Sequence, residues 1–158
     1  MNIESRDFRN ALGRFATGVC VISTVSDKGL PLGLTANSFS SVSLDPPLVL
    51  WSLQNNSDVF DVFSAPAQFA INVLASEHYE HSNRYAQKGD HLLDPAHFSL
   101  GEYGSPIVAE ALVAFECELH ATHDGGDHLI IVGRVKHVHT RDEGEPLLFY
   151  SGNYHRLA

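Results

Sequence analysis

The sequence predicts a mainly β protein, an antiparallel β-barrel with about three peripheral helices. About seven short runs of β-branched and apolar residues have the character of strands, and helical spacing is confined to the first 90 residues or so. Most neighbouring runs are joined by turns too short for the crossover connection that parallel strands require. An antiparallel sheet of this size is expected to close on itself, because closure removes its exposed edges.

Length and composition favour a single domain covering residues 1–158. The chain is 44% hydrophobic and 18% charged, and no linker, repeat or low-complexity tract divides it. A chain of this length can bury a core without disulfides. Its two cysteines, Cys20 and Cys117, form no CxxC pair, so a disulfide scaffold is excluded and a reducing compartment is expected.

The charge balance excludes several classes of partner. The chain has 19 Asp and Glu against 10 Lys and Arg, a formal net charge of -9. Such a protein repels nucleic-acid phosphates and anionic membrane surfaces. Residues 1–14 are polar and mixed in charge, unlike a signal peptide, and no apolar run approaches the roughly 18 residues that span a bilayer. We therefore expect a cytoplasmic protein without nucleic-acid or membrane partners.

The N-terminal third is predicted to form a helix followed by a hairpin. Apolar residues recur at three- and four-residue steps over residues 5–15, where Ser5 can cap the helix and Gly18 can stop it. β-branched residues over 19–25 predict a strand, and residues 31–36 its hairpin partner after an Asp-Lys-Gly turn. A small polar stretch then leads to Asp45-Pro46-Pro47, which cannot be helix or central strand.

The middle of the chain alternates predicted strands and helices. Residues 48–53 are continuously apolar, as in a strand buried on both faces, and residues 69–74 predict another strand. Helices are predicted from Ser57 to Phe63 and from Ser76 to about Lys88. Residues 90–105 carry turn residues and are expected to form a long surface loop.

The C-terminal third predicts three strands. Over residues 112–122, Phe115, Cys117 and Leu119 alternate with Glu116 and its polar neighbours, as in a half-exposed strand. A Gly-Gly-Asp turn leads into a strand over 129–138, and residues 147–150 form the last strand.

Six segments carry a resemblance to a known family. They are FRNALGRFATGV at 8–19, GLTANSF at 33–39, SVSLDPP at 41–47, FAINVL at 69–74, GDH at 126–128, and LFY at 148–150 continuing to Tyr154. In this order and spacing they resemble the flavin reductase-like family with the FMN-binding split barrel, whose members include the reductase components of two-component monooxygenases. The resemblance covers nearly the whole chain and implies a split β-barrel of Greek-key type.

A flavin ring needs small residues whose backbone N–H groups can approach its pyrimidine edge. The resemblance places the ring against Thr35, Ala36, Asn37 and Ser38, and it adds Ser41 from the next segment. Without the resemblance, the same stretch is equally compatible with an ordinary strand end and polar turn.

The flavin phosphate needs N–H groups or positive charge. The predicted helix N-terminus at Ser57 is one candidate, with Ser52 and Asn56 as further hydrogen-bond partners. Asp58 would repel a phosphate unless it faces away. The cation would be Arg84, in a segment that resembles the family's flavin-contacting arginine segment, or Lys88; an isolated helix arginine is otherwise a solvated side chain.

The Gly126-Asp127-His128 motif resembles the family's triplet on the nicotinamide side of the flavin. Hydride transfer requires the donor carbon and flavin N5 to lie roughly 3–3.5 Å apart, so Asp127 and His128 would act by positioning. Tyr154 would close the same pocket. A polar hairpin residue is the alternative interpretation of His128.

Other chemistries have weaker support. The ten histidines show no convergent zinc spacing, there is no GxSxG nucleophile elbow, and there is no GxGxxG dinucleotide motif. We therefore predict no metal and no separate nicotinamide domain.

The resemblance implies an NAD(P)H-dependent flavin reductase that transfers hydride to FMN or FAD. It also implies a homodimer and a flavin-dependent monooxygenase as the recipient of reduced flavin. The alternatives are a tight FMN-binding electron carrier or sensing module, and a reductase of another acceptor such as a corrinoid. The sequence leaves open FMN or FAD, and NADH or NADPH.

Overall fold

The computed structural model describes residues 2–158. The helical elements are α1 (Ser5–Leu12), α2 (Phe60–Phe63), η1 (Ser76–His78), α3 (Tyr79–Tyr85) and η2 (Pro95–His97). The strands are β1 (Thr17–Gly18), β2 (Cys20–Val25), β3 (Pro31–Ala36), β4 (Ser40–Leu44), β5 (Pro47–Gln54), β6 (Gln68–Val73), β7 (Phe98–Leu100), β8 (Pro106–Val108), β9 (Val113–Gly125), β10 (His128–Thr140), β11 (Leu148–Tyr150) and β12 (Asn153–His155). The predicted mainly β fold is confirmed.

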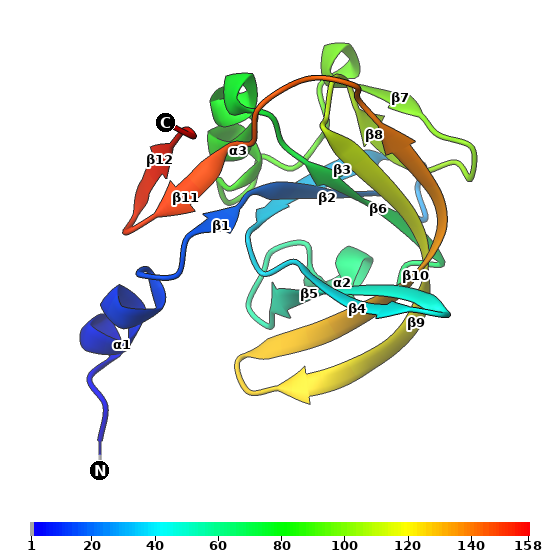
Figure 1. Cartoon of the computed structure of the whole chain (residues 1–158). Helices are drawn as coiled ribbons and strands as arrows, with labels where there is room; N and C mark the ends of the chain where they lie inside the picture. The colour runs from blue at the N-terminus through cyan, green and yellow to red at the C-terminus, as the bar shows by residue number, and fades with distance from the viewer. Residues whose placement is uncertain (1) are drawn as a thin grey trace.

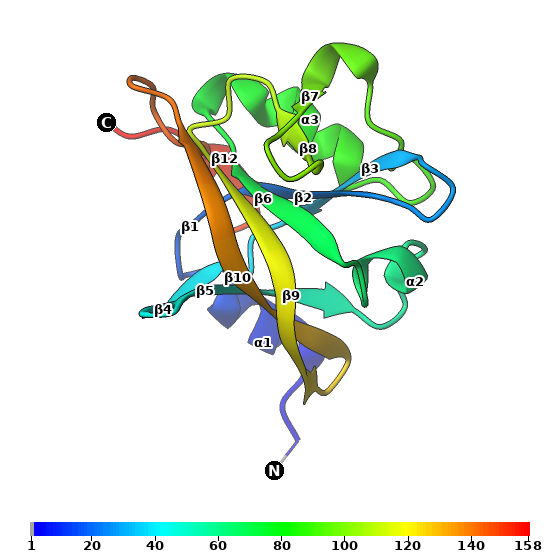
Figure 2. The ribbon, with the colours of Figure 1, turned by 90° about the vertical axis from the view of Figure 1, so that its right-hand side faces the viewer.

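A seven-stranded antiparallel sheet forms the body of the molecule. Its order is β3-β2-β6-β9-β10-β5-β4, and it curls so that its two ends face each other (Figures 1 and 2). The edge strands β3 and β4 are joined directly through residues 37–39. Two smaller sheets, β1-β11-β12 and β7-β8, complete the fold. The curl brings β3 and β5 towards each other, although β3 is one edge strand and β5 lies next to the other edge strand, β4.

Two apolar cores hold these elements. The larger core lies inside the curled sheet and includes Trp51, Phe63 of α2, Phe69 and Ile131. The smaller core lies beneath α3; its buried members are Val19, Val21, Leu74, Tyr85, Leu93, Val108 and Leu147. Burial raises the pKa of the Cys20 and Cys117 thiols to about 12, so both are protonated at neutral pH.

The N-terminal helix differs from its prediction. It ends at Leu12 instead of Phe15, its N-cap is Glu4 instead of Ser5, and Gly18 lies in β1. The helix buries none of its residues, and Phe8 and Leu12 are 53% and 59% exposed. The apolar residues of α1 therefore form a face of the helix that no other part of the described chain covers.

Several other elements also differ from their predictions. Strand β4 was not predicted, and β5 alternates between buried and half-buried residues instead of being buried on both faces. The predicted helix over 57–63 is reduced to α2, and the predicted helix over 76–88 ends at Tyr85. Residues 90–105 are not a surface loop: Leu93, His91 and Ser105 are buried, and β7 pairs with β8.

Among residues 2–158, no helix has the length and hydropathy to cross a membrane.

Glu116 was predicted on the exposed face of its strand, but it is fully buried. Its carboxylate accepts hydrogen bonds from the backbone N–H groups of Glu102 and Tyr103 at 3.0 and 2.9 Å, and it lies 2.8 Å from His139 Nε2. Gly101 packs so closely that a Cβ there would lie 2.6 Å from the carboxylate. The loop over residues 101–103 therefore folds onto a side chain that alternation alone assigns to solvent.

Replacing Glu116 with alanine is expected to lower the free energy of unfolding by about 2–4 kcal/mol, because three buried or half-buried donors lose their acceptor. Urea denaturation measures this change. Glu118→Ala, which removes a half-exposed carboxylate from the same strand, is the matched control and should change stability by less than about 0.5 kcal/mol. Equal losses in the two variants would contradict the account of Glu116.

Candidate functional site

A groove lies between β3, β5 and the turn that follows α3. Its central cavity has a volume of about 280 Å³ and is flanked by cavities of about 200 and 170 Å³. We call the three together the β3–β5 groove. They are contiguous through shared lining residues, and Ala86 lines all three. The central cavity is lined by Leu34, Thr35, Ala36, Asn37, Ser38, Trp51, Ser52, Leu53, Gln54, Ser57, Ala86 and His128.

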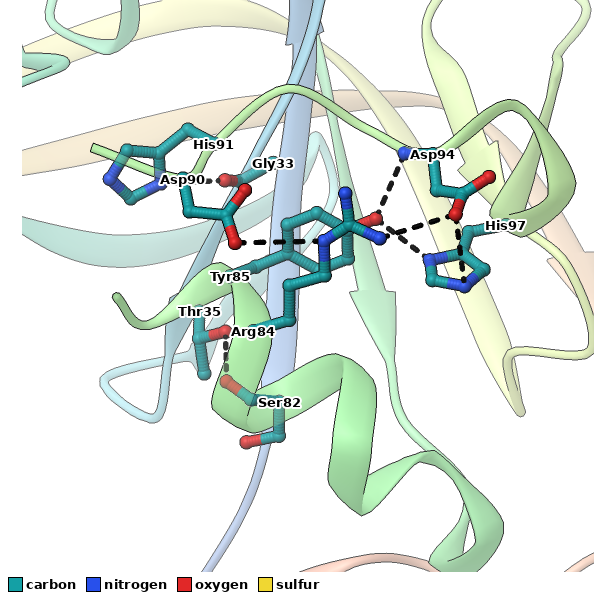
Figure 3. A network of polar contacts seen from close by, with 9 residues as sticks. All are labelled: Gly33, Thr35, Ser82, Arg84, Tyr85, Asp90, His91, Asp94 and His97. Atoms are coloured by element: carbon teal, nitrogen blue, oxygen red, sulfur yellow. Dashed lines mark hydrogen bonds and ion pairs between the residues drawn. The ribbon is translucent and has the colours of Figure 1, made fainter. Parts of the chain in front are cut away.

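The first wall is the end of β3 and the segment that leaves it. Thr35 Oγ1 donates to the carbonyl of Ser82 at 2.8 Å, which ties β3 to α3 (Figure 3). Ser38 Oγ accepts from the backbone N–H of Ser52 at 2.8 Å and so joins this segment to β5. The exposed amide of Asn37 has no side-chain partner within residues 2–158. Thr35 and Ser38 therefore shape the wall, while Asn37 is available to a ligand.

The opposite wall is β5, where Trp51 lines the central cavity. The residue is 1% exposed, and its Nε1 has no hydrogen-bond partner in the described part of the chain. A buried donor without an acceptor costs about 1–3 kcal/mol. Trp51 lines the cavity, but its Nε1 atom is itself buried and is not offered to a ligand.

His128 closes one side of the central cavity. It begins β10 directly after the β9–β10 turn, in which Gly126 has a φ of 78°. Asn55 pins this turn, because its Nδ2 donates to the Gly126 carbonyl at 3.1 Å and its backbone N–H donates to the Asp127 carbonyl at 2.9 Å. Asp127 Oδ1 lies 2.7 Å from His128 Nδ1. In the neutral ring this carboxylate holds the proton on Nδ1 and leaves Nε2 as an acceptor.

The two side cavities hold other predicted residues. Tyr154 lines one of them, and its hydroxyl lies 2.5 Å from Ser82 Oγ. Asn56 and Ser57 line the other together with Lys88, which forms no ion pair within residues 2–158. Ser57 does not begin a helix, since the N-cap of α2 is Val59. The polar end of the groove is therefore built from side chains and one free cation.

Comparison with known proteins identifies the family. The sequence pattern described as "Flavin reductase like domain" matches residues 12–158. The chain belongs to this family. Among the family's members, the chain is similar to "FMN reductase (NADH) SmoA" of Agrobacterium fabrum, with 45% identity over 98% of this chain and 87% of that protein. It is 38% identical to the HsaB reductase subunit of a flavin-dependent monooxygenase of Rhodococcus jostii, over 96% and 77% of the two chains.

Solved structures of the family have the same fold. The NADH:FAD oxidoreductase SgcE6 of Streptomyces globisporus, in complex with NAD and FAD fragments, superposes with a TM-score of 0.91. The match covers 100% of this chain and 97% of that one at 33% identity. The predicted flavin reductase-like split barrel is thus confirmed as the family and fold of this chain.

The groove gathers most, but not all, of the site residues predicted from the family resemblance. Those that line it are Thr35, Ala36, Asn37, Ser38, Ser52, Asn56, Ser57, His128 and Tyr154. Gly126 and Asp127 lie behind His128, and the Asp127 side chain is 94% exposed. Ser41 is exposed on the edge strand β4 and does not line the groove.

Arg84 does not line the groove. Its guanidinium donates to Asp94 at 3.2 Å and lies 3.8 Å from Asp90, on the side of α3 shown in Figure 3. Both carboxylates belong to the segment that was expected to be a surface loop. A flavin contact by Arg84 stays a prediction, and Lys88 is the cation that this structure brings to the groove.

Five residues that line the central cavity were not among the predicted site residues: Leu34 on β3, Trp51, Leu53 and Gln54 on β5, and Ala86. The segment whose resemblance to the family suggested Arg84 covers residues 82–86. It does reach the groove, but through Ala86 at its end and not through Arg84. Trp51 and Leu34 resemble core residues in sequence, because the wall of this groove is also the rim of the larger core.

Proposed function

We propose that the chain is an NADH-dependent flavin reductase that reduces FMN or FAD in the β3–β5 groove and supplies reduced flavin to a separate monooxygenase. The observation that carries this proposal is that three groups of residues line one groove. They are the Ala36–Ser38 segment, the polar end that contains Asn56 and Lys88, and His128. Two relatives, one named as an NADH-dependent FMN reductase and one as the reductase subunit of a flavin-dependent monooxygenase, support NADH as the donor and a monooxygenase as the recipient.

The groove residues fit a flavin. Small side chains at Ala36 and Ser38 leave the backbone accessible to the polar edge of a planar ring, and Leu34 and Leu53 offer apolar contact. Asn37 supplies an amide donor where negative charge gathers on a reduced flavin. At the other end, Asn56 and Ser57 offer hydrogen bonds, and Lys88 offers charge, to a phosphate.

His128 orients the nicotinamide in this proposal. When bound, the flavin supplies N5 as the hydride acceptor. Asp127 and the Asn55 contacts fix the His128 ring at the rim of the central cavity, where it limits where a second planar ring can lie. The contribution of His128 is therefore geometric, since hydride transfer depends on how closely the nicotinamide donor carbon approaches flavin N5.

Replacing Asn37 with alanine is expected to weaken flavin binding about fivefold to thirtyfold, because one or two hydrogen bonds are lost. The turnover number with NADH at saturating flavin should change less than the affinity. Flavin fluorescence titration gives the affinity. Ser41→Ala, an exposed hydroxyl outside the groove, should leave it unchanged, whereas an unchanged affinity in Asn37→Ala would remove Asn37 from the site.

A homodimer is part of the proposal. The apolar face of α1 is exposed, and α1 lies apart from the curled sheet in Figure 1. An eight-residue helix is marginal in water without packing, so a partner surface is expected to cover this face. Next to it, a cavity of about 270 Å³ is lined by Phe15 and Phe39 and also by Asn37 of the groove. A second copy covering this face would lie beside the flavin.

Sedimentation velocity tests the homodimer. The wild-type chain is expected to sediment as a dimer, and the variant Phe8→Ser with Leu12→Ser as a monomer whose far-ultraviolet circular dichroism keeps the β-sheet signal and loses at most the contribution of α1. A wild-type monomer at micromolar concentration would contradict the proposal.

A further inference from the structure

Asp58 lies at the phosphate end of the groove, where a carboxylate would be expected to repel the ligand. The structure shows that both of its oxygens are occupied by protein groups. Oδ2 accepts from the backbone N–H of Gly89 at 2.5 Å, and Oδ1 lies 2.9 Å from His91 Nε2. We call these contacts the Asp58 clamp.

His91 extends the clamp to β3. The ring is 6% exposed, and its Nδ1 lies 2.9 Å from the Gly33 carbonyl oxygen (Figure 3). The ring therefore links Asp58 to β3 through its two nitrogens, of which one faces the Asp58 carboxylate and the other faces the backbone carbonyl of Gly33.

The ionised form of Asp58 is favoured where it stands. Burial opposes it, but the Gly89 N–H and the neighbouring His91 together hold the pKa of this carboxyl below its ordinary value. The clamp therefore holds a charged acceptor between two donors at neutral pH.

The clamp fixes the turn that carries Lys88. Helix α3 ends at Tyr85, and the backbone bonds within the turn are long, at 3.2 Å from Gln87 N to Arg84 O and 3.3 Å from Asp90 N to Gln87 O. Asp58 accepts a hydrogen bond from the backbone N–H of Gly89, the residue directly after Lys88. Lys88 lines the same cavity as Asn56 and Ser57 and is free of ion pairs in the described chain.

We propose that Asp58 is a positioning residue that, by holding the 86–91 turn, places Lys88 at the groove and makes the chain prefer phosphate-bearing flavins over riboflavin. This inference rests on the proposed function. Asp58 itself does not bind the flavin. Asp58 raises the affinity for a flavin phosphate because fixing Lys88 beside the phosphate favours binding more than the repulsion between the carboxylate and the phosphate opposes it.

Five variants test this proposal through the dissociation constants for FMN and riboflavin, measured by fluorescence. Asp58→Ala should lower the preference for FMN about fivefold to twentyfold while riboflavin affinity stays within about twofold. Asp58→Asn should retain the preference, because its amide oxygen can accept from the Gly89 N–H and its amide N–H can donate to His91 Nε2. Asp61→Ala, an exposed carboxylate on α2, is the control for charge. In a Lys88→Gln background, Asp58→Ala should have no further effect on the preference.

A second readout needs no flavin. The Gly89 amide should exchange its hydrogen faster in Asp58→Ala than in the wild-type chain or in Asp58→Asn. Unchanged exchange would overturn the clamp.

Several binding results would overturn the proposal. A rise in FMN preference in Asp58→Ala would mean that the carboxylate only repels phosphate, and equal losses for both flavins would mean a general structural role. A wild-type chain that binds both flavins equally would also overturn it. A wild-type chain that binds neither would overturn the proposed function itself.

Discussion

Phenylalanine in place of Ala86 is expected to weaken flavin binding at least about a hundredfold, which corresponds to about 2.8 kcal/mol. Ala86 lines all three cavities of the β3–β5 groove, so one large side chain there occupies space that the ligand needs. The residue is exposed and has φ -87° and ψ -14°, a conformation that phenylalanine adopts without strain. The protein should therefore remain folded.

Gln87→Phe is the matched control for Ala86→Phe. Gln87 is exposed in the same turn but lines none of the three cavities. It adds the same side chain and should leave flavin affinity within about twofold, as expected of a surface substitution. Wild-type affinity in Ala86→Phe would show that the flavin binds elsewhere.

Alanine in place of His128 is expected to lower kcat/KM for NADH about tenfold to a hundredfold, while flavin affinity falls less than about threefold. The reason is that His128 borders the side of the groove where the nicotinamide must stack, whereas the flavin has many other contacts. Stopped-flow reduction of bound flavin separates this step from flavin binding.

His123→Ala provides the comparison for His128→Ala. His123 is exposed on the same β9–β10 hairpin and does not line the groove. Its removal should leave both hydride transfer and flavin binding unchanged. Equal losses of NADH turnover and flavin affinity in His128→Ala would count against an orienting role.

Local patterns predicted the elements that form the groove, but not all of their surroundings. The β2–β3 hairpin and the segment after it were predicted because β-branched runs and a glycine turn act locally. The Gly126-Asp127-His128 turn was predicted for the same reason. These segments contribute Thr35, Ala36, Asn37, Ser38 and His128, which line the central cavity.

Long-range contacts explain what the sequence could not show. Glu116 is buried because a loop donates two backbone N–H groups to it, and alternation along one strand contains no information about that loop. Arg84 turns away from the groove because Asp90 and Asp94 lie in a segment that packs on α3 instead of extending into solvent. Ala86 has no functional group that would mark it as a site residue in the sequence, and it lines the groove only because of its position in the turn after α3.

The most direct test of the account is NADH oxidation, followed by loss of nicotinamide absorbance, with and without added FMN, FAD and riboflavin. The flavin-free protein is expected to oxidise little NADH, and the rate is expected to rise and saturate with added FMN or FAD. Ala86→Phe should abolish this rise, and Gln87→Phe should keep it. Protein that retains flavin but does not oxidise NADH or NADPH would contradict the account and identify an electron carrier or sensing module instead.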